Sequence, residues 1–309
     1  MKPTCIAFVL LCVWLSLQIK SYSATTDSLF TSSPSNGNYR LIVAASANVV
    51  AFSGTLLLLD QLWYQQYPRT SFHFHNDLND WKQMDKLGHT VSSYQFSQLS
   101  YYSFRWANLD NRQSALWGGL SGTLIISTIE ILDGFSAQWG FSWADMGANL
   151  LGSASFLSQQ LLWEEQKIKW KYSYSRTGIE QYRPEMFGST LAENLIKDYN
   201  GHTFWISANL SSLFGLPDGF PKWLNLAIGH GASGMLGSES NPEAINDALL
   251  PRMPRYRQWY IAPDIALSRI ETGSEFLNNL LSAIDLIKFP TPTLEFNSQN
   301  KWEWHWIFF

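Results

Sequence analysis

Three short sequences between Trp81 and Gly152 organise the predicted fold. Each places one polar pair on an apolar, helix-like segment: Met84-Asp-Lys-Leu-Gly-His-Thr90, Ile129-Glu-Ile-Leu-Asp-Gly134 and Ala144-Asp-Met-Gly-Ala-Asn149. The paired residues stand three or four apart, so both members of a pair lie on one face of a helix. Ionisable groups on apolar helices cost free energy unless they are paired or bind a ligand. We therefore expect the three faces to meet and form one site.

The residues around these pairs predict four helices. They cover residues 41–63, 82–106, 113–132 and 142–167. The first is about long enough to cross a bilayer. Ser142 is a suitable N-cap for the fourth helix. Gly118, Gly119 and Gly122 leave a thin face on the third helix, which allows close helix packing. Residues 41–167 are therefore expected to form a helical bundle that carries the polar site.

The pattern changes after residue 167. Polar and aromatic side chains alternate over residues 169–174, as expected of a strand. The short apolar segments that follow are interrupted by Gly and Pro. One helix is expected near residues 274–287. The tail ends in an aromatic residue after alternating Trp, which resembles in part the insertion signal of outer-membrane proteins. The predicted fold class is therefore mainly α: a bundle of about four apolar or amphipathic helices, then a mixed α/β region over residues 168–309 with short strands and one helix.

Residues 1–24 have the features of a secretory signal peptide. A positive residue precedes an apolar run, and small residues suited to cleavage follow it. A retained membrane anchor is the alternative. Cys5 and Cys12 both lie in this segment, so its removal would leave no thiol for disulfides or catalysis. Residues 25–40, rich in Ser, Thr, Asn and Gly, are expected to form a flexible tail.

The composition points towards a membrane. Charged residues make up 15% of the chain, against about 25% in ordinary soluble domains. Aromatic residues also make up 15%, with 15 Trp among them, which suits a membrane interface. The alternative is a soluble protein with an aromatic core. The net charge of −4 offers no basic surface, so nucleic acid is not an expected partner. The oligomeric state does not follow from the sequence.

The polar pairs supply the candidate catalytic residues. Carboxylates with an imidazole can hold a divalent metal that activates water, or an Asp–His pair can act as general base. The alternative is a structural network in which Asp85 pairs with Lys86 or His89 and the other residues tie the helices together. Hard oxygen ligands with one imidazole permit many metals and select none, so the cofactor stays open. The candidate site residues are Asp85, His89, Glu130, Asp133, Asp145 and Asn149.

Two weaker candidates lie beside this set. Ser142 could be a nucleophile near His89, but it is outside any G-x-S-x-G sequence, and a role as N-cap explains it more simply. His73 and His75 have the spacing of a metal pair, and a solvated loop is the simpler interpretation.

The motifs resemble a known family. Asp85-Lys-x-x-His89, Glu130-x-x-Asp133-Gly and Phe141-Ser-x-x-Asp145-x-x-x-Asn149-x-x-Gly152 are similar to the YfiM-like predicted periplasmic lipoproteins (DUF2279). Together with the half that ends at Phe309, the chain resembles the long Bacteroidetes form. It also faintly resembles VanZ-like membrane proteins. One type of protein from the Bacteroidetes is linked to deacylation of lipid A. The resemblance implies a similar activity for this chain. The lipoprotein cysteine of the shorter relatives is missing here.

These features together predict a protein of the bacterial cell envelope, at the outer membrane or facing the periplasm. The expected activity is hydrolysis of acyl esters of lipid A, with lipid and the membrane as partners. His89 would be general base or metal ligand, oriented by Asp85. Glu130, Asp133 and Asp145 would bind a metal or share protons, and Asn149 would position the substrate. The alternative is a non-catalytic membrane protein of the envelope that binds lipid or an assembly partner.

Overall fold

The computed structural model describes residues 37–62, 67–245 and 247–309 and divides into two compact units. Unit 1 comprises Met1–His75, Ser92–Gln166 and Glu271–Ile284. Unit 2 comprises Asn76–Val91, Lys167–Ile270 and Asp285–Phe309. The expected signal peptide (1–24) and most of the expected tail (25–40) lie outside the described residues.

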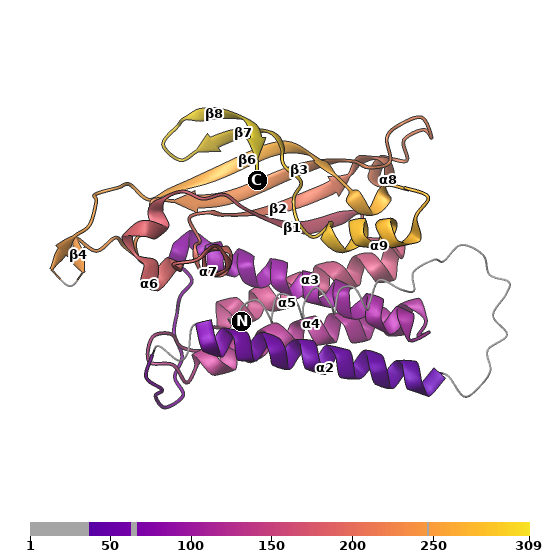
Figure 1. Cartoon of the computed structure of the whole chain (residues 1–309), viewed down its shortest axis with the longest axis horizontal. Helices are drawn as coiled ribbons and strands as arrows, with labels where there is room; N and C mark the ends of the chain where they lie inside the picture. Colours follow the sequence, from indigo (N-terminus) through magenta and orange to yellow (C-terminus); the bar gives the residue numbers. More distant parts are fainter. Residues whose placement is uncertain (1–36, 63–66, 246) are drawn as a thin grey trace. The chain divides into compact units, whose positions relative to one another are not determined.

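Unit 1 is helical (Figure 1). Its helices are α2 (Gly37–Leu62), most of α3 (Met84–Trp106), α4 (Asn111–Asp133), α5 (Trp143–Trp163) and α9 (Glu275–Ile284). Two segments, Tyr39–Gln61 and Asn111–Asp133, are long and apolar enough to cross a membrane. Only 11% of the first segment is buried, so α2 presents apolar side chains to its surroundings.

Local capping fixes where α4 and α5 begin. The Asp110 side chain accepts a hydrogen bond from Gln113 N at 2.7 Å, and Ser142 Oγ accepts one from Asp145 N at 3.1 Å. Such N-caps satisfy backbone donors that the first helical turn leaves free and each contribute about 1 kcal/mol. The predicted N-cap at Ser142 is confirmed.

Small residues let α3 approach both α4 and α5 closely. A Cβ at Gly122 would collide with Ser97 Oγ and lie 2.6 Å from the carbonyl oxygen of Ser93. On the α5 side, Ser93 Oγ donates to the carbonyl oxygen of Asn149 at 2.7 Å, and Ser97 Oγ lies 3.1 Å from Ser153 Oγ. Because Ser93 lies beside Asn149 and Ser97 lies beside Ser153, α3 and α5 run parallel. The residues of α4 that contact α3 follow one another in the opposite order, so α4 is antiparallel to α3.

Unit 2 is built on a six-stranded sheet, with the hairpin β7–β8 at one edge (Figure 1). Every neighbouring pair is antiparallel. The strand order is β1 (Ile168–Tyr174), β2 (His202–Asn209), β3 (Leu224–Ser233), β6 (Tyr256–Ile265), β7 (Thr291–Asn297) and β8 (Trp302–Phe308). The smaller elements are β4 (Ala244–Ile245), β5 (Ala248–Leu249), α6 (Pro184–Phe187), α7 (Leu191–Lys197) and α8 (Leu210–Phe214).

The predicted fold class is therefore wrong. The described part of the chain has 8 helices, is 48% helical and 22% strand, and carries a six-stranded antiparallel sheet. Four helices, α6 to α9, follow the bundle where one was expected. Strands were underestimated because polar side chains such as Ser207, Asn225 and Asp264 occupy buried positions of the sheet, where a hydrophobic pattern is normally sought.

The two faces of the sheet differ in polarity. One face carries an apolar ladder, a row of apolar residues in which each lies directly opposite the next on the neighbouring strand. Its members, one from each of the six strands, are Trp170, Ile206, Ile228, Ile261, Leu294 and Trp304. The other face holds buried polar residues around a small core that includes Trp205 and Tyr260. Ile228 and Ile261 in the ladder are 58% and 54% exposed. The sheet thus buries polar groups on one face and leaves much of its apolar face uncovered.

Candidate functional site

The α4 and α5 parts of the predicted site come together in unit 1. Glu130, Asp145 and Asn149 are all buried. Glu130 Oε2 accepts a hydrogen bond from Ser142 N at 3.3 Å, which places this carboxylate at the N-terminus of α5. Free backbone donors and the helix dipole favour negative charge there. The end of α5 therefore supports two buried carboxylates, those of Glu130 and Asp145.

His89 lies on the part of α3 that belongs to unit 2, whereas Glu130 and Asp145 belong to unit 1. His89 is half-buried. Two carboxylates with an imidazole could hold a divalent ion or share protons. That His89 joins the two carboxylates in one site stays a prediction.

The other predicted residues have different surroundings. Asp85 accepts a hydrogen bond from Lys86 N at 2.9 Å, and Lys86 Nζ lies 2.8 Å from both Asp85 Oδ2 and Asp77 Oδ2. This ion pair was the structural alternative for Asp85. Asp133 is half-buried at the last position of α4, one turn beyond Glu130.

The weaker candidates have structural roles. Ser142 Oγ is occupied in capping α5. His73 Nε2 lies 2.6 Å from the carbonyl oxygen of Trp139, in a loop whose backbone also bonds to Gly134 and Phe141. These contacts explain His73 without a metal.

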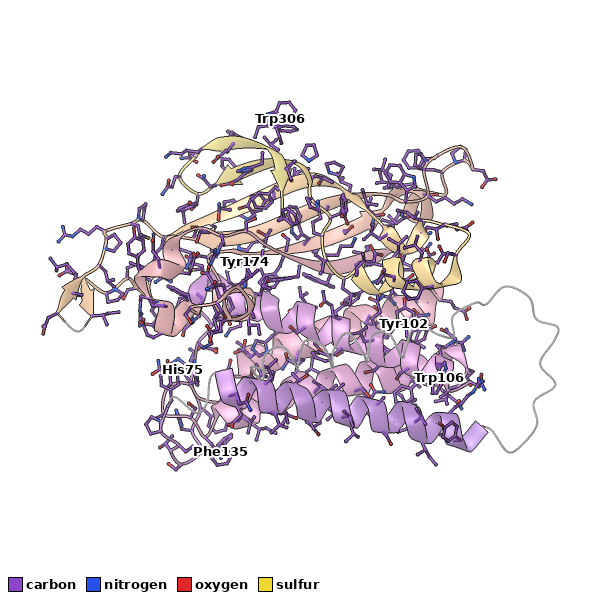
Figure 2. The ribbon with its side chains drawn as sticks, viewed as in Figure 1. His75, Tyr102, Trp106, Phe135, Tyr174 and Trp306 are labelled. Atoms are coloured by element: carbon purple, nitrogen blue, oxygen red, sulfur yellow. The ribbon has the colours of Figure 1, made fainter. Side chains whose placement is uncertain are left out.

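Sequence reasoning missed an aromatic cluster beside the site. Its rings are Phe72, Phe74, Phe135, Phe141 and Trp143, with neighbouring centroids 5.0 to 6.2 Å apart. Phe74 is 62% exposed and Trp143 70% exposed. Figure 2 shows Phe135 at one end of the helices of unit 1 and Trp106 at the opposite end. The local Phe-x-Phe spacing was the available signal, but the pairing of two distant loops brings the rings together.

The fold of unit 1 is thus a bundle of apolar helices that holds two buried carboxylates at the start of α5. Residues 74–160 match the model of a family described as predicted periplasmic lipoprotein (DUF2279). This family description is consistent with a place in the cell envelope, facing the periplasm. The matched segment contains all six predicted site residues. No curated protein and no solved structure matches the chain.

Proposed function

We propose that this protein is a membrane-associated hydrolase of the bacterial cell envelope that cleaves an acyl ester of a lipid, with lipid A as the first substrate to test. The observation that carries the proposal is the pair of buried carboxylates, Glu130 and Asp145, at the N-terminus of α5 in unit 1. His89 is proposed as the imidazole that acts with them. A buried acid–histidine cluster of this kind is a common source of general-base catalysis.

In the proposed reaction, His89 removes a proton from water as the water oxygen bonds to the acyl carbonyl carbon. The carboxylates of Glu130 and Asp145 stabilise the imidazolium that forms. The ester C–O bond then breaks, and the imidazolium returns the proton to the departing alkoxide. In the alternative in which the three side chains hold a divalent cation, His89 would be a ligand rather than the base, and the cation would polarise the carbonyl and lower the pKa of a bound water. Asp85 and Asn149, one turn from His89 and Asp145, are proposed positioning residues, and Asp133 remains a candidate.

Exposed apolar groups support a lipid substrate. Trp143 lies in the same first turn of α5 as Asp145 and belongs to the exposed aromatic cluster. Acyl chains that lie against these rings would bring their ester close to the buried carboxylates. Along α2, Val49, Val50 and Leu57 are each more than 60% exposed, as expected of a helix that faces hydrocarbon rather than water.

The test compares His89→Gln and Asp145→Asn with Glu164→Gln, a carboxylate control at the exposed end of α5. Each form is expressed in a deletion strain, and extracted lipid A is analysed by mass spectrometry, with membrane levels of the protein measured in parallel. We expect the wild type and the control to remove an acyl chain. The two site variants should lose roughly 10²-fold or more of the rate. An unchanged lipid A pattern in the site variants at normal protein levels contradicts the proposal.

A second candidate is a non-catalytic envelope protein in which the polar groups lock the helices together. The Asp77–Lys86–Asp85 ion pairs favour it, because they occupy one predicted site residue in a purely structural contact. In that case the two variants lower the protein level, while lipid A is the same in the deletion strain and its parent.

A further inference from the structure

Unit 2 holds a second cluster of metal-ligating side chains, on the polar face of its sheet. Glu295 on β7 and Glu303 on β8 are directly opposite each other, and His305 follows two residues later on β8. This register points all three side chains to the same face of the sheet. Their ligand atoms lie within 4.8 Å of one another. His305 Nε2 is 2.9 Å from Glu295 Oε2.

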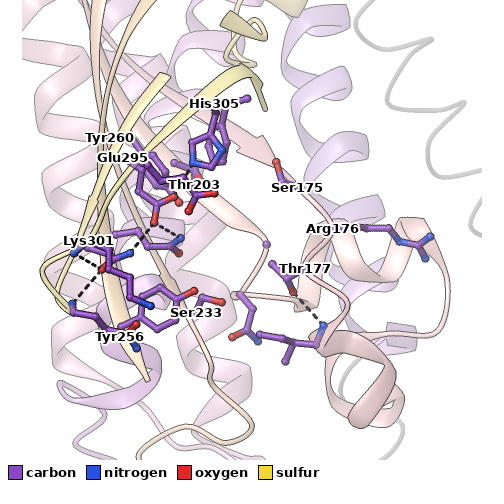
Figure 3. Close-up of a pocket in the computed structure, with 18 residues that line it drawn as sticks. Ser175, Arg176, Thr177, Thr203, Ser233, Tyr256, Tyr260, Glu295, Lys301 and His305 are labelled. Atoms are coloured by element: carbon purple, nitrogen blue, oxygen red, sulfur yellow. Dashed lines mark hydrogen bonds and ion pairs between the residues drawn. The ribbon is translucent and has the colours of Figure 1, made fainter. Parts of the chain in front are cut away.

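The cluster opens into a cavity (Figure 3). The cavity has a volume of about 440 Å³ and a polar lining. Its lining includes four residues with hydroxyl groups, Tyr256, Tyr260, Thr203 and Ser233, and the exposed residue Lys301. A cavity of this size and polarity has room for several waters or a small hydrophilic ligand beside the cluster.

Amide donors hold the Glu295 carboxylate in place. The side chain is only 3% exposed. Its Oε1 accepts hydrogen bonds from Gln258 Nε2 at 3.0 Å and from Asn297 Nδ2 at 3.3 Å, while Oε2 faces His305. Outer contacts of this kind orient a ligating carboxylate in metal sites. They also leave Oε2 aimed at the point where the three side chains meet.

The charges of the cluster favour a cation. Glu295 and Glu303 carry like charges on neighbouring strands, and within the cluster a single imidazole balances at most one of them. Lys301, which also lines the cavity, is exposed to solvent, which screens its charge. A simple His305–Glu295 ion pair would leave the second carboxylate, Glu303, without a function in the cluster. A cation at the centre would neutralise both carboxylates. Ligands at about 2.1 Å and a right angle are roughly 3 Å apart, close to the 2.9 Å that separates His305 Nε2 from Glu295 Oε2.

We propose that Glu295, Glu303 and His305 bind a divalent ion of the first transition row, such as Mn²⁺ or Zn²⁺, and that the cavity holds its remaining water or small polar ligands. The imidazole favours these ions over Mg²⁺ and Ca²⁺, which prefer oxygen ligands alone. This site shares no residue with the proposed hydrolase site and does not depend on the hydrolase proposal.

The test uses the purified full chain carrying His89→Gln, so that the helical cluster contributes no imidazole. Mn²⁺ or Zn²⁺ alone is titrated by calorimetry, and bound metal is counted after dialysis. The variants Glu303→Gln and His305→Gln are compared with Glu271→Gln, a control at an exposed carboxylate. Glu303 is exposed, so its substitution keeps the fold intact even if changes at buried Glu295 do not.

We expect one bound ion per chain in the His89→Gln protein and in the Glu271→Gln control. Glu303→Gln and His305→Gln should each weaken binding by 10-fold or more while the far-UV spectrum and Tm without metal stay the same. Absence of binding by the folded protein at millimolar metal overturns the proposal. Equal affinity in both cluster variants and the control also overturns it.

Discussion

The ammonium of Lys171 lies 2.8 Å from the carboxylate of Asp285, and both side chains are buried in unit 2. The second oxygen of Asp285 lies 2.6 Å from Lys169 Nζ. Burial by itself would raise the pKa of Asp285, but the attraction of Lys169 and Lys171 holds this pKa well below its usual range. Asp285 also accepts a hydrogen bond from Leu267 N at 2.9 Å. One carboxylate therefore joins β1 to the segment that follows β6.

Asp285→Asn should destabilise the protein by about 3–5 kcal/mol, because it leaves two ammonium groups in the sheet without their shared partner. Denaturant unfolding in detergent measures the loss. Asp218→Asn is the matched control, since Asp218 forms a fully exposed pair with Lys222 at 3.7 Å, and such pairs contribute little. A loss for Asp285→Asn that is no larger than that of the control would show that the network has no structural role.

Titration of the buried Asp198 carboxyl group should lower the free energy of unfolding as the pH rises. Burial raises its pKa to about 6 from an ordinary value of 3.8, although Asn200 and Tyr174 donate hydrogen bonds to the carboxyl group. Between pH 3.8 and about pH 6, the carboxyl group is therefore protonated to a greater extent in the folded state than in the unfolded state. The free energy of unfolding decreases as the pH rises through this range. The full effect is at most about 3 kcal/mol.

The check compares wild type with Asp198→Asn by denaturant unfolding from pH 4 to pH 7. The difference in unfolding free energy between the two proteins should change across this range, because only the wild type can lose the proton at position 198. Parallel pH profiles for the two proteins would mean that Asp198 titrates near its ordinary pKa.

The helices of the bundle could be predicted because their signals are local. The expected ranges 82–106 and 113–132 correspond to α3 (Met84–Trp106) and α4 (Asn111–Asp133). Apolar periodicity and the cap at Ser142 depend only on neighbouring residues. Most of the sheet could not be predicted in the same way, because its inward positions hold residues such as Ser207 and Asp264 that a hydrophobic pattern assigns to the surface.

The candidate sites depended on information that spacing does not contain. Spacing predicts that Asp145 and Asn149 share a helix face, but the level of α3 against α5 is set by the contact of Ser93 with Asn149. Whether the helical cluster catalyses a reaction stays a prediction. Glu295 and His305 are ten positions apart, and only the register of the β7–β8 hairpin places them together. That register cannot be derived from the sequence of the C-terminal segment, in which the alternation of side chains is only partial.

Two glycines on neighbouring helices should respond to the same substitution with opposite signs. A Cβ at Gly122 in α4 would collide with Ser97 Oγ and the Ser93 carbonyl, whereas one at Gly147 in α5 would meet nothing within 4 Å. Gly122→Ala should therefore destabilise by about 1–3 kcal/mol through overpacking. Gly147→Ala should stabilise by up to about 1 kcal/mol, because Ala is the better helix former. Thermal unfolding in detergent measures both, and a stabilised Gly122→Ala would show that α3 and α4 are not closely packed.

The apolar ladder of the sheet should face lipid in the membrane-associated protein that we propose. Ile228 and Ile261 lie opposite each other on β3 and β6 and are largely exposed, and burial of one such side chain is worth roughly 1.5–3 kcal/mol. A polarity-sensitive dye on Ile228→Cys, with Cys5 and Cys12 replaced by Ser, should shift its emission to the blue when phospholipid vesicles are added. The same dye on Leu249→Cys, which is 86% exposed in the β4–β5 hairpin, should keep the emission of a water-exposed label. Because both positions are exposed in the protein itself, only contact of the ladder with hydrocarbon separates them, and identical emission at the two positions would place the ladder in water.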